Sequence, residues 1–283
     1  MEQTRITLLC ENTAAGLFGL LGEHGFAALV QKDGRNLLFD TGQGHTLAHN
    51  MRYLGLSGVS LDGIVLSHGH FDHTGGLADA LLQSGGAPVT AHPAVLGAKY
   101  SRHKTPEGPK HTYIGMPHDR AFLEDTLGAR FQFVSEFQQI QPGVYFSGEV
   151  PRVTDFETSD TAMMVYSEDG MQQDLLADDA SLLIETESGP VVLLGCAHAG
   201  AVNVLRHFRE QTGYTRFHAV IGGTHLGFLD EDTQLEQTIS ALEDFGLERI
   251  AVSHCTGQYA AAAFLGHFGD RFAFAGAGWS AVF

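Results

Sequence analysis

Residues 67–76 of the chain are Ser67-His68-Gly69-His70-Phe71-Asp72-His73-Thr74-Gly75-Gly76, with three histidines and one aspartate inside six positions. The stretch follows the apolar run 63–67 (GIVLS), which predicts a buried strand, and it leads into a segment at 75–82 that predicts a helix. A turn between a strand and a helix can direct alternate side chains to one spot while the strand holds the turn rigid. Neutral imidazole suits Zn²⁺, and a carboxylate adds charge and can orient a water on the metal. The stretch therefore predicts a metal site at a strand end.

Short apolar runs separated by turn signals surround this stretch and predict alternating strands and helices. Near the N-terminus, the runs 5–10, 27–32 and 36–40 predict strands, and Asp33-Gly34 predicts a hairpin turn between the last two. Residues 46–55 predict a short helix that ends at Gly55. Further strands are expected at 87–91, 190–194, 218–221, 250–253 and 271–275, and further helices at 201–211, 232–245 and 258–268.

The segment 98–160 differs from the rest of the chain in charge and in pattern. It contains seven of the sixteen basic residues and five of the eight prolines, and it has no regular apolar period. We therefore expect a long excursion over the surface and not a separate domain, so that residues 1–283 form a single domain. Residues 98–130 are expected to be a shaped loop without regular structure that covers the metal as a lid. In that lid, Lys104 and Lys110 would bind an anionic group of the substrate.

The charge balance of the chain excludes some classes of partner. Sixteen Lys and Arg stand against 33 Asp and Glu, and the net charge of −17 has the wrong sign for a general binder of nucleic acid or of an anionic membrane. The three cysteines are far apart and form no C-x-x-C pair, which favours a reducing compartment. No apolar run suits a signal peptide or a membrane span. We expect a cytoplasmic protein with a small-molecule substrate, and the sequence indicates no oligomeric state.

The pattern H-x-H-x-D-H followed by T-G-G resembles the signature of the metallo-β-lactamase superfamily. The resemblance implies an α+β fold, a four-layer αββα sandwich with the metal site at one edge. It also implies that His68 and His70 bind one metal ion and that Asp72 and His73 bind a second. Asp40, in the stretch Leu38-Phe39-Asp40-Thr41-Gly42, resembles the early aspartate of the family, which lies beneath the metal loop and orients it.

The second half of the chain carries three more polar strand ends that the resemblance makes candidates. In Gly195-Cys196-Ala197-His198, His198 is expected to be a metal ligand, and Cys196 falls where many relatives have a bridging aspartate. Asp179 falls where many relatives have a histidine ligand, so both Asp179 and Cys196 are candidates for metal binding or for support of the ligands. His254, in S-H-C-T-G, resembles the last metal histidine. His225, in G-G-T-H-L, could be a ligand, a general acid or a substrate contact.

Several of these stretches, in this order, are similar to one branch of the superfamily, the proteins named for 7,8-dihydropterin-6-methyl-4-(β-D-ribofuranosyl)aminobenzene-5′-phosphate synthase. The similarity spans nearly the whole chain and includes Glu23-His24-Gly25-Phe26 near the N-terminus and Gly148-Glu149-Val150-Pro151-Arg152 in the middle. His24 is a candidate substrate contact.

Three functions follow from these patterns. The first is a metal-dependent hydrolase or related transferase that uses one or two Zn²⁺ ions to activate water, with Asp72 and His225 as catalytic residues and a phosphorylated or pterin-like substrate. The second is the coupling of a pterin to a ribosyl-phosphate aniline. The third is a metal-binding or sensing protein without turnover. Manganese or iron would also fit the donors. The charge of −17 argues against RNA processing, and His70 stands where oxygen-reducing di-iron relatives have a glutamate.

Overall fold

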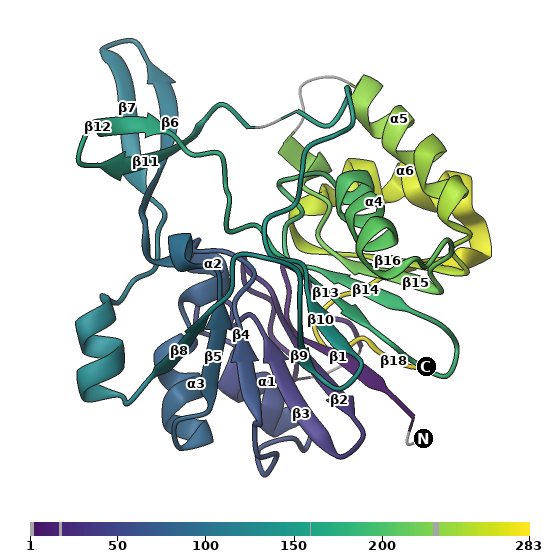
Figure 1. Ribbon diagram of the computed structural model, residues 1–283, viewed down its shortest axis with the longest axis horizontal. Helices are drawn as coiled ribbons and strands as arrows, with labels where there is room; N and C mark the ends of the chain where they lie inside the picture. The colour runs from purple at the N-terminus through teal and green to yellow at the C-terminus, as the bar shows by residue number, and fades with distance from the viewer. Residues whose placement is uncertain (1–2, 17–18, 159, 229–231) are drawn as a thin grey trace.

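A computed structural model describes residues 3–16, 19–158, 160–228 and 232–283 of the chain. Within these residues, two seven-stranded sheets pack face to face and helices cover the outer face of each, while a third sheet of four strands projects from one side (Figure 1). This arrangement confirms the predicted four-layer αββα sandwich. No helix in the described part of the chain is long and apolar enough to cross a membrane.

The first large sheet is built from the first half of the chain, and the last strand of the whole chain adds to one edge of it. Its strands are, in spatial order, β18 (Ser280–Val282), β1 (Arg5–Cys10), β2 (Ala27–Lys32), β3 (Arg35–Phe39), β4 (Gly63–Val65), β5 (Pro88–Ala91) and β8 (Arg130–Phe133). Strands β3, β4, β5 and β8 are parallel. The outer face is covered by α1 (Leu47–Tyr53) and α3 (Leu77–Ser84). The short helix α2 (Phe71–Thr74) lies in the turn after β4.

The second large sheet is built from the second half of the chain. Its strands are β17 (Phe272–Phe274), β16 (Arg249–Val252), β15 (Ala219–Gly222), β14 (Val191–Leu194), β13 (Ser181–Ile184), β10 (Val144–Phe146) and β9 (Gln138–Gln141). The strands from β14 to β17 are parallel. The helices α4 (Ala201–Thr212), α5 (Asp232–Leu242) and α6 (Gly257–Phe268) cover its outer face.

Three apolar cores hold these layers together. One core lies between the two sheets and includes Leu8 and Phe39 of the first sheet and Leu182 and Ile221 of the second. The other two lie between each sheet and its own helices. Strands buried on both faces have no polar side to expose, which is why β14 (VVLL) and β13 (SLLI) are almost continuously apolar. Polar turns follow the parallel strands of both sheets at one edge of the sandwich.

The predicted hairpin and strand–helix order of both halves are confirmed, but the middle segment differs from the prediction. Asp33 and Gly34 have φ of 48° and 73°, as a two-residue hairpin turn requires, and Lys32 pairs with Arg35. Residues 130–146 are not a surface excursion, because β8 lies in the first sheet and β9 and β10 lie in the second.

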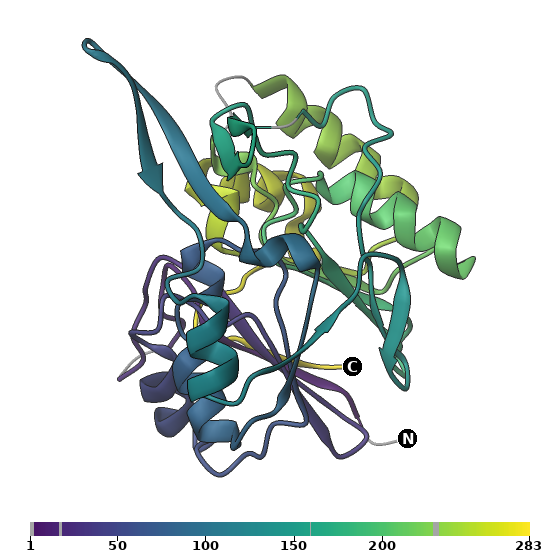
Figure 2. The same ribbon diagram turned by 60° about the vertical axis from the view of Figure 1, so that its left-hand side comes forward.

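The segment at 98–113 also has regular structure where a loop without it was predicted. β6 (Ala98–Thr105) and β7 (Gly108–Tyr113) form a hairpin that extends well beyond the body of the molecule (Figure 2). β11 (Met163–Ser167) pairs with β6, and β12 (Gly170–Gln173) pairs with β11. The residues of β7 (GPKHTY) are exposed on both faces and show no apolar period, so the local pattern did not predict a strand.

Candidate metal centre

The polar turns that follow β3, β4, β14, β15 and β16 meet at one edge of the sandwich. Because parallel strands present their carboxyl ends on the same side, side chains from distant parts of the chain converge there. His68 and His198 are 130 residues apart and His73 and His254 are 181 apart, yet each pair lies within 3.3 Å at the ring nitrogens. The structure thus brings together most of the residues that the sequence singled out: His68, His70, Asp72, His73, Cys196, His198, His225 and His254.

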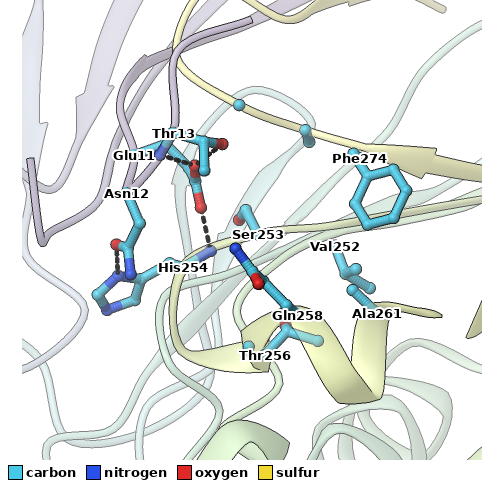
Figure 3. A pocket seen from close by; sticks show the side chains of 13 residues that line it. Glu11, Asn12, Thr13, Val252, Ser253, His254, Thr256, Gln258, Ala261 and Phe274 are labelled. Carbon is cyan, nitrogen blue, oxygen red and sulfur yellow. Dashed lines mark hydrogen bonds between the residues drawn. The ribbon is translucent and has the colours of Figure 1, made fainter. Parts of the chain in front are cut away.

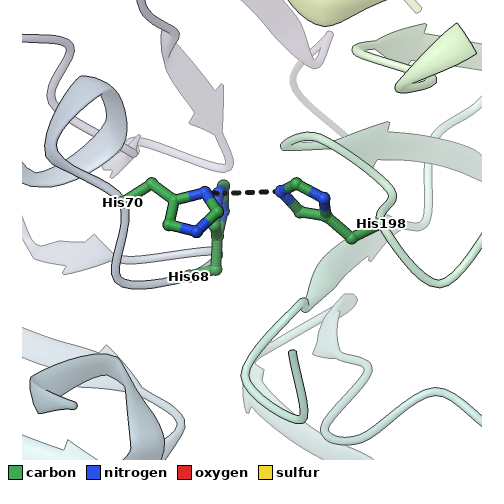
Figure 4. Close-up of side chains that lie close together, drawn as sticks. All are labelled: His68, His70 and His198. Carbon is green, nitrogen blue, oxygen red and sulfur yellow. Dashed lines mark hydrogen bonds between the residues drawn. The ribbon is translucent and has the colours of Figure 1, made fainter. Parts of the chain in front are cut away.

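The first set of donors consists of three buried imidazoles, those of His68, His70 and His198. His68 Nε2 lies 2.9 Å from His70 Nδ1 and 3.3 Å from His198 Nε2, and Figure 4 shows the three rings turned toward one another from two loops on opposite sides. Burial lowers the pKa of His68 and of His198 well below the usual value, and it lowers that of His70 to about 3. The three rings are therefore neutral near pH 7, with unshared electron pairs available to a cation.

The second set of donors adjoins the first and contains one carboxylate. His73 Nε2 lies 3.2 Å from His254 Nε2, and Asp72 Oδ2 lies 3.3 Å from His254 Nε2 and 3.8 Å from His73 Nε2. His24 Nε2 lies 3.2 Å from the same carboxylate oxygen. Burial alone would raise the pKa of Asp72, but the charge of His73 and hydrogen bonds from His24 and His254 hold it well below its usual value. This set carries the negative charge that the first set lacks.

Asp40 fixes the orientation of His73 from beneath. Its side chain is fully buried and accepts hydrogen bonds from Ser67 N, Ser67 Oγ and His73 Nδ1, each at 2.7 Å. Because a carboxylate only accepts, Nδ1 of His73 carries a hydrogen, and Nε2 faces the second set, where a bound cation would replace any proton. Burial lowers the pKa of His73, but the Asp40 and Asp72 carboxylates outweigh it and raise the pKa to about 9.

His254 is held by two residues that the sequence analysis did not identify. Glu11 accepts a hydrogen bond from the backbone nitrogen of His254, and Asn12 Oδ1 lies 2.9 Å from His254 Nδ1. Figure 3 shows both contacts beside a cavity of about 220 Å³ behind the histidine. The contact to Asn12 leaves His254 Nε2 free to face Asp72. No local signal pointed to Glu11 or Asn12, because they follow β1 and lie more than 240 residues away in sequence.

Asp179 is placed behind the first set and is in none of the groups of converging donor atoms among the described residues. Its Oδ2 accepts a hydrogen bond of 2.8 Å from Ala199 N, so it supports the loop that carries His198. Burial raises its pKa to about 6. The neighbouring Asp178 has a similar place: its Oδ2 accepts a hydrogen bond of 2.8 Å from Gly69 N, between His68 and His70.

Cys196 lies between the two sets of donors. Its Sγ is 3.1 Å from His73 Nε2, and it forms one group of converging donors with His68 and His73 and another with His198 and His225. Burial raises the pKa of its thiol well above the usual value. Its position would let Sγ bind a cation together with histidines from both sets, with loss of the thiol proton on binding.

Both sets of donors open into one cavity of about 390 Å³. His225 lines the same cavity, with its ring centroid 4.1 Å from that of His198. Its Nε2 is 3.7 Å from Asp160 Oδ2, an ion-pair distance and too long for a hydrogen bond. Burial lowers the pKa of His225, but its interactions with Asp160 and Cys255 outweigh burial and raise the pKa to about 9. The imidazolium leaves the cavity with a cationic wall.

The structure does not bring the two predicted substrate lysines to this cavity. Lys104 and Lys110 lie on the exposed part of the β6–β7 hairpin, and neither lines the cavity, which the hairpin reaches only through Ser101, His103 and Ile114. Lys99, at the root of the hairpin, is 1% exposed and pairs with Asp174 and Asp178 at 2.7 and 2.8 Å. Four of the seven basic residues of the segment thus lie on β6 and β7, one in a buried ion pair and three exposed: Lys99, Arg102, Lys104 and Lys110.

Comparisons with known proteins agree with this geometry. A family model described as the metallo-β-lactamase superfamily matches residues 21–165. The 7,8-dihydropterin-6-methyl-4-(β-D-ribofuranosyl)-aminobenzene-5′-phosphate synthase of Methanocaldococcus jannaschii is 30% identical to this chain over 96% of its length and 94% of the relative. The crystal structure of Tm1679, a metal-dependent hydrolase of the β-lactamase superfamily, matches with a TM-score of 0.82 and 29% identity over 98% of each chain. Zn²⁺-bound PqqB from Methylobacterium extorquens, at 14% identity and a TM-score of 0.53 over 98% of this chain and 99% of its own, shows the same fold.

Proposed function

The chain belongs to the metallo-β-lactamase superfamily, and we propose that it is a metal-dependent hydrolase, or a related transferase, that acts on a small anionic substrate. The observation that carries the proposal is the pair of adjoining donor sets that open into one cavity of about 390 Å³. Each neutral imidazole keeps an unshared electron pair on one ring nitrogen, and with ring nitrogens 2.9 to 3.3 Å apart the three rings can turn these pairs toward one cation. The donors thus fit a metal ion.

The two sets divide the ligands between two ions. His68, His70 and His198 would hold one ion, and Asp72, His73 and His254 would hold the second, with Cys196 placed to contact either. Imidazole with a carboxylate and a thiolate favours Zn²⁺ over the harder Mn²⁺, although Fe²⁺ shares part of this preference. The chemistry that such ions supply is the acidification of a water molecule and the polarisation of a substrate oxygen.

The protein's own groups would position the substrate. Asp72 faces the cavity and is ionised, so it can accept a hydrogen bond from the attacking water and hold its orientation. The raised pKa of His225, about 9, supplies positive charge to the cavity wall, and the Asp72 carboxylate raises the pKa of His24 above its ordinary value. A phosphate or carboxylate group between them would be paired with charge, and the protonated His225 could deliver a hydrogen to a leaving oxygen.

A second candidate reaction is the coupling of a dihydropterin to a ribosylaminobenzene phosphate. It is favoured by the similarity to the synthase from Methanocaldococcus jannaschii, which extends over 96% of this chain and not only over the metal motif. Its aniline substrate carries the phosphate that the cationic wall would bind. Both reactions would place an anionic substrate in the same cavity.

The test is turnover by the purified protein with a metal content measured by elemental analysis. Metal-replete and chelated protein are compared on phosphate mono- and diesters, lactones, and a dihydropterin with the aniline phosphate. We expect Zn²⁺ to co-purify and one class of substrate to be turned over only by the replete protein. Tight metal binding without turnover of any of these compounds would instead favour a metal-binding or sensing protein, and absence of metal binding would overturn the proposal.

A further inference from the structure

A buried ion cluster outside the cavity touches the metal-facing turn. Lys99 Nζ donates to Asp174 Oδ2 at 2.7 Å and to Asp178 Oδ1 at 2.8 Å, and the three residues are at most 8% exposed. The second oxygen of Asp178 accepts from the backbone nitrogen of Gly69 at 2.8 Å. Gly69 lies between His68 and His70, whose donor atoms are 2.9 Å apart.

We propose that Asp178 and Lys99 are positioning residues for the metal centre: their ion pair holds the Gly69 peptide and thereby sets the separation of His68 and His70. The inference rests on the proposed metal centre, and it adds the ion pair that gives the first donor set its geometry. Neither residue contacts the cavity, and both act through the turn.

The packing around Gly69 shows how little freedom the turn has. A Cβ at Gly69 would clash with Val95 O and would lie 2.9 Å from Lys99 Cε. The aliphatic part of the Lys99 side chain thus packs against Gly69. Its ammonium group binds Asp178, and the carboxylate of Asp178 accepts the hydrogen bond from Gly69 N. A lysine that served only to neutralise Asp174 and Asp178 would not need this contact with the turn.

A second connection joins the turn to the same hairpin. Phe71 N donates to Ile114 O at 2.9 Å, and Ile114 N donates to Lys99 O at 2.9 Å. The two sides of the hairpin root therefore bind the turn on either side of His70, one through Asp178 and Gly69, the other through Ile114 and Phe71. Since the hairpin also lines the cavity through Ser101, His103 and Ile114, a substrate that displaces the hairpin would displace the ligands.

Asp174 provides a matched control for Asp178. Both carboxylates are buried, and each binds Lys99 through one oxygen and a backbone nitrogen through the other. The backbone partner of Asp174 is Leu176 N at 2.8 Å, outside the metal turn, whereas that of Asp178 is Gly69 N. Asp174→Asn and Asp178→Asn each remove one charge from Lys99 and place an amide hydrogen where an acceptor was. The variants differ in the backbone segment that they release.

The experiment compares the two variants in the full-length protein loaded with Co²⁺, by competition with a chelator and by the visible absorption of the bound ion. We expect Asp178→Asn to lower the affinity for the ion bound by the first donor set by about ten- to a hundredfold, as changes behind metal ligands do. The variant should also alter the absorption bands. Asp174→Asn should leave both unchanged, although both variants lower the stability of the fold. Equal effects of the two variants on affinity and absorption, or none, would overturn the inference.

A second pair of variants covers the case in which a variant lacking the charge does not fold. Asp178→Glu and Asp174→Glu keep every charge and move the carboxylate by one methylene. Only Asp178→Glu should change the absorption of bound Co²⁺, and the same change in Asp174→Glu would contradict the proposal. Failure of the wild-type protein to bind Co²⁺ would instead count against the metal centre itself, so the two failures are distinguishable.

Discussion

The turn at residues 67–76 and the root of the β6–β7 hairpin are joined by hydrogen bonds. The polar side chains of the turn are nevertheless buried and fixed by partners, whereas those of the outer hairpin are exposed. In the turn, His68, Asp72 and His73 are at most 6% exposed, and their nitrogen and oxygen atoms have partners from three other strand ends. On the hairpin, Lys104 and Lys110 are exposed, and the strands that carry them pair only with each other beyond residue 102. Preorganised groups of the first kind supply chemistry, because the fold has already fixed their orientation.

Asp72→Asn tests the turn and should have the largest effect. The amide is nearly isosteric with the carboxylate, but it cannot act as an anionic ligand or accept a proton. We expect kcat/KM to fall by about 10²–10⁴-fold, the range for loss of a general acid or base, while circular dichroism and the unfolding midpoint remain close to those of the wild type. Activity equal to that of the wild type would show that Asp72 has no chemical part.

Lys99→Met tests the root of the hairpin, where the two regions meet. The change leaves the carboxylates of Asp174 and Asp178 buried without their cation, and breaking a buried pair costs about 3–5 kcal/mol. Urea unfolding at pH 7 should show this loss in the free energy of unfolding. Lys104→Met, on the exposed part of the same strand, is the control and should change it by less than about 0.5 kcal/mol. Similar losses in both variants would mean that the root is no more ordered than the tip.

Removal of the metal should loosen the turn and spare the hairpin. A ligand present at a hundred times its dissociation constant stabilises the folded state by about 2.7 kcal/mol, so chelation should lower the melting temperature. Hydrogen exchange locates the change: the amides of residues 68–73 should exchange faster after chelation, and those of residues 100–112 should not. Faster exchange confined to the hairpin would contradict the division between the two regions.

The same contrast explains which parts of the structure the sequence predicted. His68, His70, Asp72 and His73 were identifiable because a short motif follows an apolar strand, and the strand end fixes their place. His198 and His254 follow strands of the same kind. The contacts of Gly69 with Asp178 and of His254 with Asn12 join residues 109 and 242 positions apart, and no local pattern contains such pairs. The hairpin was missed because exposed strands lack the apolar alternation on which strand prediction depends.

Basic composition also predicted a role for the segment at 98–130 without predicting where its charges lie. Lys99 was counted only among the seven basic residues of the segment 98–160, and Lys104 and Lys110 were the lysines predicted to bind the substrate. In the structure Lys99 is buried beside the metal turn, whereas Lys104 and Lys110 lie on the two paired strands of the exposed hairpin. Charge alone does not distinguish these positions, because burial is decided by which distant carboxylates come to lie nearby.

Replacement of Lys104 and Lys110 together by alanine should have the smallest effect and completes the comparison. The two lysines were predicted from the sequence to bind an anionic substrate, but neither lines the cavity. Exposed charges of this kind act through screened, long-range attraction worth little energy at physiological salt. We therefore expect kcat and KM for a phosphorylated substrate to remain within about twofold of the wild type at 0.15 M salt, with the same result for a neutral analogue. An increase in KM for the phosphorylated substrate alone would show that the hairpin folds over the cavity during binding and would restore the lysines as substrate contacts.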